Sequence, residues 1–290
     1  MDLTRTFRFG AVAAYARSGQ DWAATARRVE DLGFSTLLCP DTTGTLSPFP
    51  ALSAAATVTS TLRLGTYVLA APLRTPATVA WETASLDVLS DGRFELGIGA
   101  GRPGSEHDAA RLGVPFGRAG ERIAQLEATL AAVRARYSGE DPAAQHDAVR
   151  GIQRFQPSIL MAGTGPRMLA LAAEHADSIA LGLPPLSTDD DLDAKVRELR
   201  EIAGDRFDGL ELNINVALVG DDVPAHAASW FGADPKELFR VGAITALRGT
   251  PREMADTLLR RRDRTGVSYV SVNSMFADQF APVIEFLDGA

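Results

Sequence analysis

The stretch LDVLSDGRFELGIGAGRPGSE, residues 86–106, decides how the rest of the chain is interpreted. It begins with the end of an apolar helix and breaks at Ser90-Asp91-Gly92, which has turn chemistry. The apolar run 94–98 then has the length of one buried strand. Glycines and the carboxylate of Glu106 follow, and glycines after a strand let another group approach the backbone closely. The stretch therefore predicts a helix, a tight turn, a strand and a loop at a ligand site.

The same loop contains the pattern G-x-G-x-x-G at Gly99, Gly101 and Gly104. In a dinucleotide-binding domain this pattern follows the first strand, and its last glycine opens a helix. Here the preceding strand is about the fourth in the chain, and the next helix is expected only near Phe116. A Rossmann domain and a glycine-rich loop without a ligand are alternatives. The preferred interpretation is a ligand-binding loop of another fold.

Length and composition bound the class of protein. The 290 residues allow one large domain or two small ones, and a chain of this size buries enough surface to need no disulfides. The single cysteine, Cys39, excludes an internal disulfide and is expected to lie in the core. The N-terminus lacks the apolar segment of a signal peptide, and no apolar run approaches the ~20 residues of a membrane span. We expect a cytoplasmic protein that does not enter a membrane.

Charge and motifs exclude several functions. The net charge is -8 and the basic residues are scattered, which argues against a nucleic-acid surface. The four histidines form neither H-x-H nor H-E-x-x-H and do not cluster with cysteine, so no metal site is predicted. The chain lacks G-x-S-x-G and G-x-x-x-x-G-K-[ST], which argues against that type of hydrolase and against the usual nucleotide triphosphate loop.

Apolar runs alternate with helical patterns along the whole chain. The expected strands are 7–14, 36–39, 62–69, 94–98, 159–161, 179–181, 210–219 and 267–272. The expected helices are 21–32, 50–59, 77–89, 118–136, 167–174, 191–203, 251–265 and 280–287. Eight such units favour an α/β fold of the (β/α)8 TIM-barrel type over an open doubly wound sheet. We predict a single domain, 1–290, with insertions after the 118–136 helix and after the 210–219 strand.

A barrel carries its active site on the loops that follow its strands. Asp41 follows the 36–39 strand and is a candidate acid, base or cofactor-binding acceptor; the alternative is a structural turn residue. Tyr67 and Val68 lie at the corresponding end of the 62–69 strand, and Arg102 follows the 94–98 strand. Arg93 lies at the opposite end of that strand and is expected to be structural.

The segment Ala162-Gly163-Thr164-Gly165-Pro166 ends one expected strand and opens a helix. Two glycines free the backbone, a hydroxyl lies between them, and the amide groups of a helix N-terminus follow. That combination is suited to binding a phosphate group. A plain turn is the alternative from this segment alone.

Taken together, these segments resemble the luciferase-like flavin and deazaflavin oxidoreductase family. The combination of L-D-x-L-S-x-G-R with a following G-x-G-x-G is the most specific part of the resemblance. The other matching segments are Glu30-Asp31-Leu32-Gly33-Phe34, Pro40-Asp41, Leu62-Arg63-Leu64-Gly65-Thr66, Pro72-Leu73-Arg74-Thr75-Pro76, Gly113-Val114-Pro115-Phe116, Gly163-Thr164-Gly165-Pro166 and Gly249-Thr250-Pro251.

The resemblance implies a barrel that binds the deazaflavin F420, or alternatively FMN, and acts on a small organic substrate. In F420-using members a non-proline cis peptide follows the third strand, and its match here is Tyr67-Val68. The resemblance places the cofactor phosphate on Gly163, Thr164 and Gly165. The expected cofactor-binding residues are Asp41, Thr66, Tyr67, Val68, Ala100, Gly101, Arg102, Ala162, Gly163, Thr164 and Gly165, and the expected catalytic residues are Asp41 and Thr42.

Two positions depart from the family pattern. Several deazaflavin dehydrogenases carry Asp-His where this chain has Asp41-Thr42, and some carry a carboxylate where Arg102 stands. The sugar-phosphate dehydrogenase mechanism therefore lacks its base and acid, and hydride transfer by the cofactor remains. An FMN-dependent luciferase-like monooxygenase, a non-catalytic flavin-binding barrel and an NAD-dependent Rossmann dehydrogenase are the alternatives. The 42–49 loop and the insertions are expected to set specificity, and the resemblance leaves a homodimer open beside a monomer.

Overall fold

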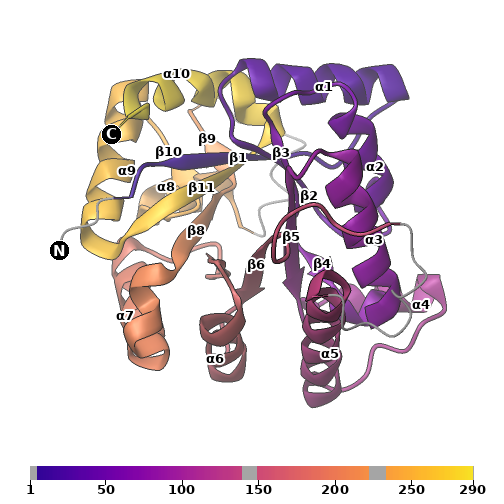
Figure 1. Ribbon diagram of the computed structural model, residues 1–290. Coiled ribbons are helices and arrows are strands. Elements are labelled where there is room, and N and C mark those ends of the chain that lie inside the picture. Colours follow the sequence, from indigo (N-terminus) through magenta and orange to yellow (C-terminus); the bar gives the residue numbers. More distant parts are fainter. Residues whose placement is uncertain (1–4, 139–148, 222–232, 290) are drawn as a thin grey trace. The chain divides into compact units, whose positions relative to one another are not determined.

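The computed structural model describes residues 5–138, 149–221 and 233–289 (Figure 1). Its fold is the expected (β/α)8 barrel of parallel strands and surrounding helices. By internal contacts the chain divides into two compact units. The C-terminal unit comprises Met1–Ala13, Val29–Ser35 and Gly163–Ala290, and the N-terminal unit comprises Ala14–Arg28 and Thr36–Ala162.

The strands of the N-terminal unit form parallel pairs in the order β2 (Thr36–Cys39), β3 (Arg63–Thr66), β5 (Phe94–Gly99) and β6 (Ser158–Gly163), and the short β4 (Leu69–Ala70) pairs with the end of β5. Every residue of β2 and β5 is buried, as in strands covered on both faces. The helices along this part are α1 (Gly19–Asp31), α2 (Pro48–Ala56), η1 (Ala71–Leu73), α3 (Pro76–Leu89), α4 (Ser105–Leu112) and α5 (Ala119–Ser138). In Figure 1, α3 and α5 pack against each other.

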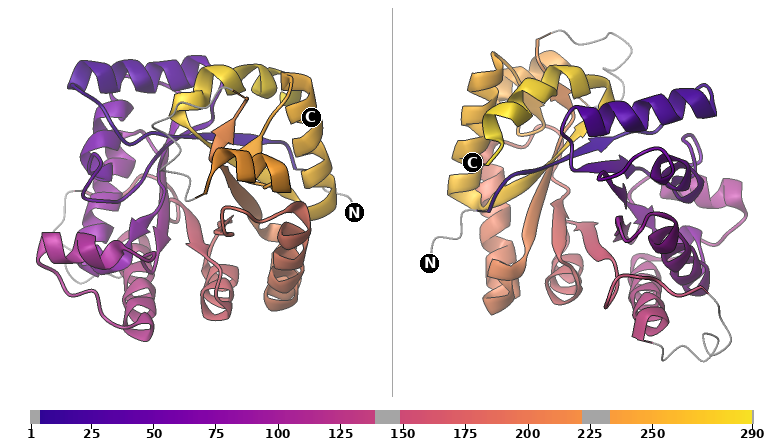
Figure 2. Two further views of the ribbon diagram at one scale, coloured as in Figure 1. Left: turned by 180° about the vertical axis from the view of Figure 1, so that it is seen from behind. Right: turned by 45° about the horizontal axis from the view of Figure 1, so that its top comes forward.

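The strands of the C-terminal unit pair in the order β1 (Arg8–Val12), β11 (Val267–Asn273), β8 (Glu211–Val216) and β7 (Ser178–Leu181), again parallel. A separate small sheet joins β9 (Leu218–Val219) to β10 (Ala246–Leu247). The helices are α6 (Pro166–His175), α7 (Asp189–Ala203), η3 (Gly204–Gly209), α8 (Pro235–Val241), α9 (Pro251–Thr265), η5 (Ser274–Phe276) and α10 (Ala277–Leu287). Figure 2 shows α9 beside α10, in contact along their packed faces.

Local sequence signals explain where the helices begin. Thr75 caps α3 by accepting a hydrogen bond from the Thr78 amide. The first helical residue is a proline in both α3 and α9. Thr250 and Glu253 form a capping box at the start of α9. Proline costs nothing there because the first amide of a helix has no partner within the helix. The prediction of 251–265 as a helix is accordingly confirmed to the residue.

Two side chains of the 86–106 stretch hold the strand end that is remote from the candidate site. The buried Asp87 carboxylate accepts hydrogen bonds from the amides of Ile152 and Gln153 at 2.7 and 3.0 Å. The Arg93 guanidinium donates to the carbonyls of Ala56 and Leu62, both at 2.9 Å. The expectation that Arg93 is structural is therefore confirmed.

Three expectations about elements were wrong. The 62–69 strand is interrupted and becomes β3 and β4, and the 210–219 strand becomes β8 and β9. A helix, α4, begins directly after Gly104, although the next helix was expected near Phe116. Its sequence SEHDAARL is short and polar, so it has little apolar periodicity. The expected insertions lie partly at 139–148 and 222–232, outside the described residues; the rest of the second contains α8 and β10.

Within the described ranges, no helix is both long enough and apolar enough to cross a membrane.

Candidate functional site

Asp41 follows β2 and is fixed by three hydrogen bonds. Its side chain is 7% exposed and accepts from the Arg74 guanidinium at 2.6 and 3.0 Å and from the Ala70 amide at 3.1 Å. Two parallel bonds from one guanidinium are the strong form of this contact. Asp41 thus ties the end of β2 to the segment that contains β4 and η1, and its carboxylate is already occupied as an acceptor.

Arg74 lies between two carboxylates. Its Nε atom lies 3.8 Å from the Glu82 carboxylate on α3, a longer contact than the bidentate pair with Asp41. Burial raises the pKa of Glu82, the negative charge of Asp41 adds to that rise, and Arg74 opposes it. The Arg74 guanidinium is therefore paired mainly with Asp41.

The segment between β3 and β4 contains the cis peptide bond expected from the resemblance, between Tyr67 and Val68. The Tyr67 amide donates to the Cys39 carbonyl at 2.7 Å. The Thr66 hydroxyl donates to the Gly97 carbonyl at 2.7 Å and accepts from the Gly97 amide at 2.9 Å. This segment is consequently attached to β2 on one side and to β5 on the other.

The loop after β5 presents an exposed arginine, Arg102. Gly101 has φ 85°, a left-handed conformation that favours glycine, and the neighbouring Ala100 carbonyl accepts from Arg122 at 3.0 Å. Arg102 is exposed, and its guanidinium donates to the Pro103 carbonyl at 3.2 Å. No ion pair of Arg102 within 4.0 Å is found among the described residues, and its positive charge acts on the nearby Asp108 carboxylate.

A residue that the sequence did not indicate holds the turn after Asp41. Asp108, on α4, is 5% exposed and accepts from the Thr43 hydroxyl at 2.6 Å and from the Thr43 amide at 3.0 Å. Burial alone would raise the pKa of Asp108, but the hydrogen bonds from Thr43 and the charges of Arg102 and Arg111 lower it. Because 65 residues separate the partners, only the fold reveals this contact.

The β6–α6 turn belongs to the C-terminal unit. Gly165 precedes α6 with ordinary extended angles, and the following Pro166 is the first helical residue. A Cβ atom on Gly163 would lie 2.8 Å from the Cβ of Met168, whereas one on Gly165 would meet no atom of the described residues within 4 Å apart from its two chain neighbours. The open space at Gly165, next to the unpaired amides of the helix start, fits an anionic group.

The structure thus distributes the predicted residues over both units. The N-terminal unit contains Asp41, Thr42, Thr66, Tyr67, Val68, Ala100, Gly101, Arg102 and Ala162, and its hydrogen bonds join Asp41, Thr66 and Tyr67 to the ends of β2, β4 and β5. Gly163, Thr164 and Gly165 form one turn of the C-terminal unit, where Lys195 donates to the Thr164 carbonyl at 3.3 Å.

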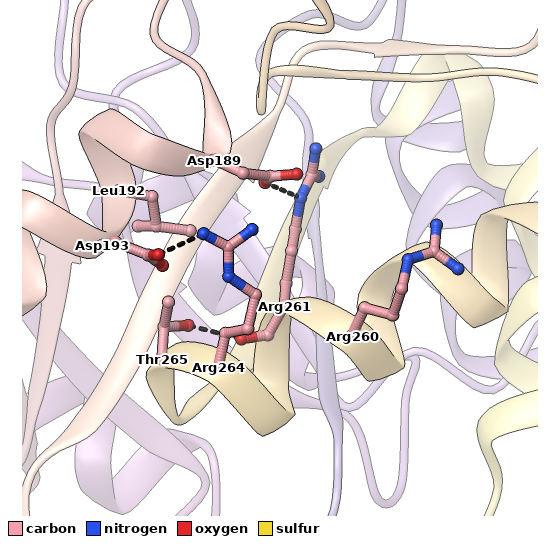
Figure 3. A pocket seen from close by; sticks show the side chains of 7 residues that line it. All are labelled: Asp189, Leu192, Asp193, Arg260, Arg261, Arg264 and Thr265. Carbon is pink, nitrogen blue, oxygen red and sulfur yellow. Dashed lines mark hydrogen bonds and ion pairs between the residues drawn. The ribbon is translucent and has the colours of Figure 1, made fainter.

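A small pocket of about 60 Å³ lies between α7 and α9, and no predicted site residue lines it (Figure 3). Four of its five charged side chains are paired with one another, and the fifth, Arg260, donates to the Thr257 hydroxyl at 2.8 Å. Arg261 donates to Asp189 at 2.7 Å, and Arg264 pairs with Asp193. We therefore interpret the pocket as an ionic contact between two helices. Among the described residues, no three acidic, histidine or cysteine side chains are grouped to hold a metal ion.

A model of the luciferase-like monooxygenase family matches residues 3–267. The chain is 30% identical to the uncharacterized protein Rv0953c of Mycobacterium tuberculosis over 282 residues, which cover 86% of this chain and 93% of that protein.

Two solved structures share the fold at 18% sequence identity. Riboflavin lyase, solved with modified FMN and riboflavin, has a TM-score of 0.75 and matches over 99% of this chain and 93% of that one. The coenzyme F420 dependent tetrahydromethanopterin reductase of Methanopyrus kandleri has a TM-score of 0.70 and matches over 97% of each chain. The barrel topology is not the doubly wound sheet of a Rossmann domain, so the G-x-G-x-x-G pattern in the β5–α4 loop is not a dinucleotide fingerprint.

Proposed function

Because the chain belongs to the luciferase-like monooxygenase family, we propose that it is an oxidoreductase that uses the deazaflavin F420 for hydride transfer to or from a small organic substrate. The compact chain and the motif resemblance support F420. FMN is the second candidate, since riboflavin lyase was solved with modified FMN on the same fold. Both cofactors carry a phosphate, so the observation that carries the proposal is the β6–α6 turn.

The phosphate would be held by the backbone of that turn. Gly163 ends β6, Thr164 and Gly165 lead into α6, and the first amides of α6 follow Pro166. The space beside Gly165 is suited to a ligand, because a Cβ atom there would meet no described residue within 4 Å beyond its two neighbours in the chain. Backbone amides and a hydroxyl suffice for a phosphate, without a cluster of charged side chains.

The ring system would be held by Thr66, Tyr67, Val68, Ala100, Gly101, Arg102 and Ala162. When bound, the cofactor supplies the chemistry of hydride transfer, and the protein supplies binding, orientation and exclusion of water. Asp41 fixes the segment after β3 through Ala70 and Arg74. The Thr42 hydroxyl donates a long hydrogen bond to the Thr45 hydroxyl at 3.5 Å, and we assign it as a hydrogen-bonding group for the substrate.

Titration of the purified protein with F420 and with FMN tests the choice of cofactor. Intrinsic fluorescence reports binding, and the proposal expects a micromolar dissociation constant for F420 that is at least about tenfold below that for FMN, a difference of about 1.4 kcal/mol. Micromolar binding of FMN with none of F420 would assign the second candidate. Binding of neither would remove the proposed function.

A turnover assay separates an enzyme from a barrel that only binds flavin. Reduced cofactor is mixed with a panel of enones, quinones and aldehydes, and its oxidation is followed by absorbance with and without protein. The proposal expects acceleration by the protein with at least one acceptor. Tight binding of the cofactor, together with no acceleration for any acceptor in the panel, would favour the binding-only alternative.

We further propose a cytoplasmic homodimer. The exposed apolar side chains Trp81 and Leu89 on α3, at 61% and 58% exposure, would then be covered by a second copy. Light scattering that returns the 30.8 kDa mass of one chain would contradict the dimer.

A further inference from the structure

The turn that follows Asp41 is held from two sides. Thr45 closes it by donating from its amide to the Thr42 carbonyl at 3.1 Å, and the Leu46 amide donates to the Ala14 carbonyl at 3.0 Å. Asp41, before the turn, binds the Ala70 amide. Thr43, within the turn, binds Asp108 on α4. The turn therefore cannot shift without breaking one of these attachments.

Asp108 acts on this turn and not on its own helix. Burying a carboxylate is costly unless hydrogen bonds replace its water, and both hydrogen bonds found for Asp108 come from Thr43. Arg111, one helical turn later, donates to the Thr43 hydroxyl at 3.1 Å. The hydroxyl thus donates to a carboxylate and accepts from a guanidinium, which fixes its direction.

The helix that carries Asp108 is itself fixed. The Glu106 carboxylate accepts from the Gly104 amide at 2.9 Å at the start of α4. Ala109 is buried in one cluster with Ala70 and Leu73, from β4 and η1. The same β4 segment binds Asp41, so Asp41 contacts it directly and Thr43 contacts it through α4.

We infer that Asp108 is a positioning residue for substrate, which holds the Thr42–Thr45 turn in place through Thr43. The turn follows a barrel strand at its carboxyl end, where substrates bind in this fold. The identity of the ligand in this inference rests on the proposed function. The attachment of the turn to Asp108 is independent of that function. Its consequence is that loss of Asp108 weakens substrate binding and leaves cofactor binding unchanged.

The first test measures the turn alone. Asp108→Ala removes both hydrogen bonds, while Asp108→Asn keeps an acceptor oxygen. The matched control is Glu106→Gln, which removes a charge from the same helix but keeps an acceptor oxygen for the Gly104 amide. Hydrogen exchange of residues 41–46, read by mass spectrometry, is expected to be about ten- to a hundred-fold faster in Asp108→Ala. Asp108→Asn should fall between that variant and the parent, and Glu106→Gln should match the parent. Unchanged exchange in Asp108→Ala would overturn the inference.

The second test measures function with reduced F420 and the best acceptor of the panel. Asp108→Ala is expected to raise the KM of the acceptor about tenfold, with kcat within about threefold and the F420 dissociation constant within about twofold of the parent; Asp108→Asn should recover most of the lost affinity. A rise of the F420 dissociation constant equal to that of the KM would overturn the assignment to substrate. If Asp108→Ala does not fold, Asp108→Asn carries both tests. Failure of F420 to bind removes the proposed function, and the exchange test still decides the attachment of the turn.

Discussion

At the scale of single residues, the contacts of Asp41 distinguish a structural role from a role in proton transfer. Sequence position made Asp41 a candidate for proton transfer, but the structure shows its carboxylate occupied by Arg74 and the Ala70 amide. We therefore expect Asp41→Asn to act mainly through stability, costing roughly 3 kcal/mol because it leaves Arg74 without its close partner.

Chemical denaturation of Asp41→Asn, Arg74→Gln and the double variant checks this prediction. The two single losses should not add, because both remove the same contact. A variant Asp41→Asn that keeps the parent's stability but loses kcat would instead assign proton transfer to Asp41.

Asp108 gives a dependence of stability on pH. Because its pKa is lowered in the folded protein, the folded state binds its proton more weakly than the unfolded state does. The stabilisation is therefore complete above the ordinary aspartate pKa of about 3.9 and is lost as the pH falls through the lowered folded value. Urea midpoints of the parent and of Asp108→Ala should differ by a constant amount from neutral pH down to about pH 5, and the difference should shrink steadily as the pH falls below about 4. A difference that does not shrink between about pH 5 and about pH 3 would contradict the lowered pKa.

The sequence predicted features that depend on neighbouring residues, but not contacts between residues that lie far apart along the chain. Asp41 was named because it follows the apolar run 36–39, a pattern visible in one dimension, and Thr42 because it stands where several relatives carry histidine. The partner Arg74 lies 33 residues from Asp41, and Asp108 lies 65 residues from Thr43. No local periodicity encodes such pairings. They became visible only when the strands fixed which loops are neighbours.

At the scale of elements, the β6–α6 turn gives a paired prediction. The sequence suggested that a side chain at either glycine of the turn would block the approach of a phosphate or forbid the required backbone angles; neither glycine has a positive φ, so blocking of the approach is the remaining reason. Gly163→Val should lower the melting temperature, because its Cβ would meet Met168 at 2.8 Å. Gly165→Val should leave the melting temperature unchanged and weaken F420 binding at least tenfold, because its side chain would enter the proposed phosphate space.

Dissociation constants measured beside melting temperatures distinguish the two variants. The control is Gly209→Val, which also meets no atom within 4 Å and lies at the end of η3, outside the candidate site. It should bind F420 like the parent. If Gly165→Val also binds like the parent, the phosphate lies elsewhere.

The elements themselves were predicted where a single signal governs them. The buried 36–39 strand and the proline-started 251–265 helix agree with the structure in both bounds. The 62–69 strand did not, because its apolar run continues through the Tyr67–Val68 bond, where pairing is interrupted. Helix α4 was missed because a left-handed Gly104 opens it, and glycine was taken as part of the loop.

At the scale of the whole molecule, net charge predicts how salt affects ligand binding. The chain carries a net charge of -8, and at the β6–α6 turn a single lysine, Lys195, donates to the Thr164 carbonyl in the described structure, so binding of an anionic cofactor should depend mainly on amide donors. Between 50 and 500 mM salt we expect the F420 dissociation constant to change less than about threefold, whereas binding governed by six or more basic contacts would weaken by about a thousandfold or more. Fluorescence titrations at both concentrations measure this, and a loss above a hundredfold would indicate an ionic site.

The fold class was predictable because the alternation of strands and helices extends over the whole chain, so errors in single elements did not change the architecture. The candidate site was predictable as a set of strand ends. Its attachments were not, because they depend on side chains that meet only after folding.

The contact between Thr66 and Gly97 has a consequence for anyone who diversifies this enzyme in the laboratory. A Cβ atom at position 97 would lie 1.8 Å from the Thr66 carbonyl oxygen, so every codon other than glycine forces two neighbouring backbones apart. Position 97 therefore belongs outside a randomised library, where each added codon would only dilute the folded clones. Position 165, where a side chain would point into open space, is the more informative position to randomise when a different cofactor is wanted.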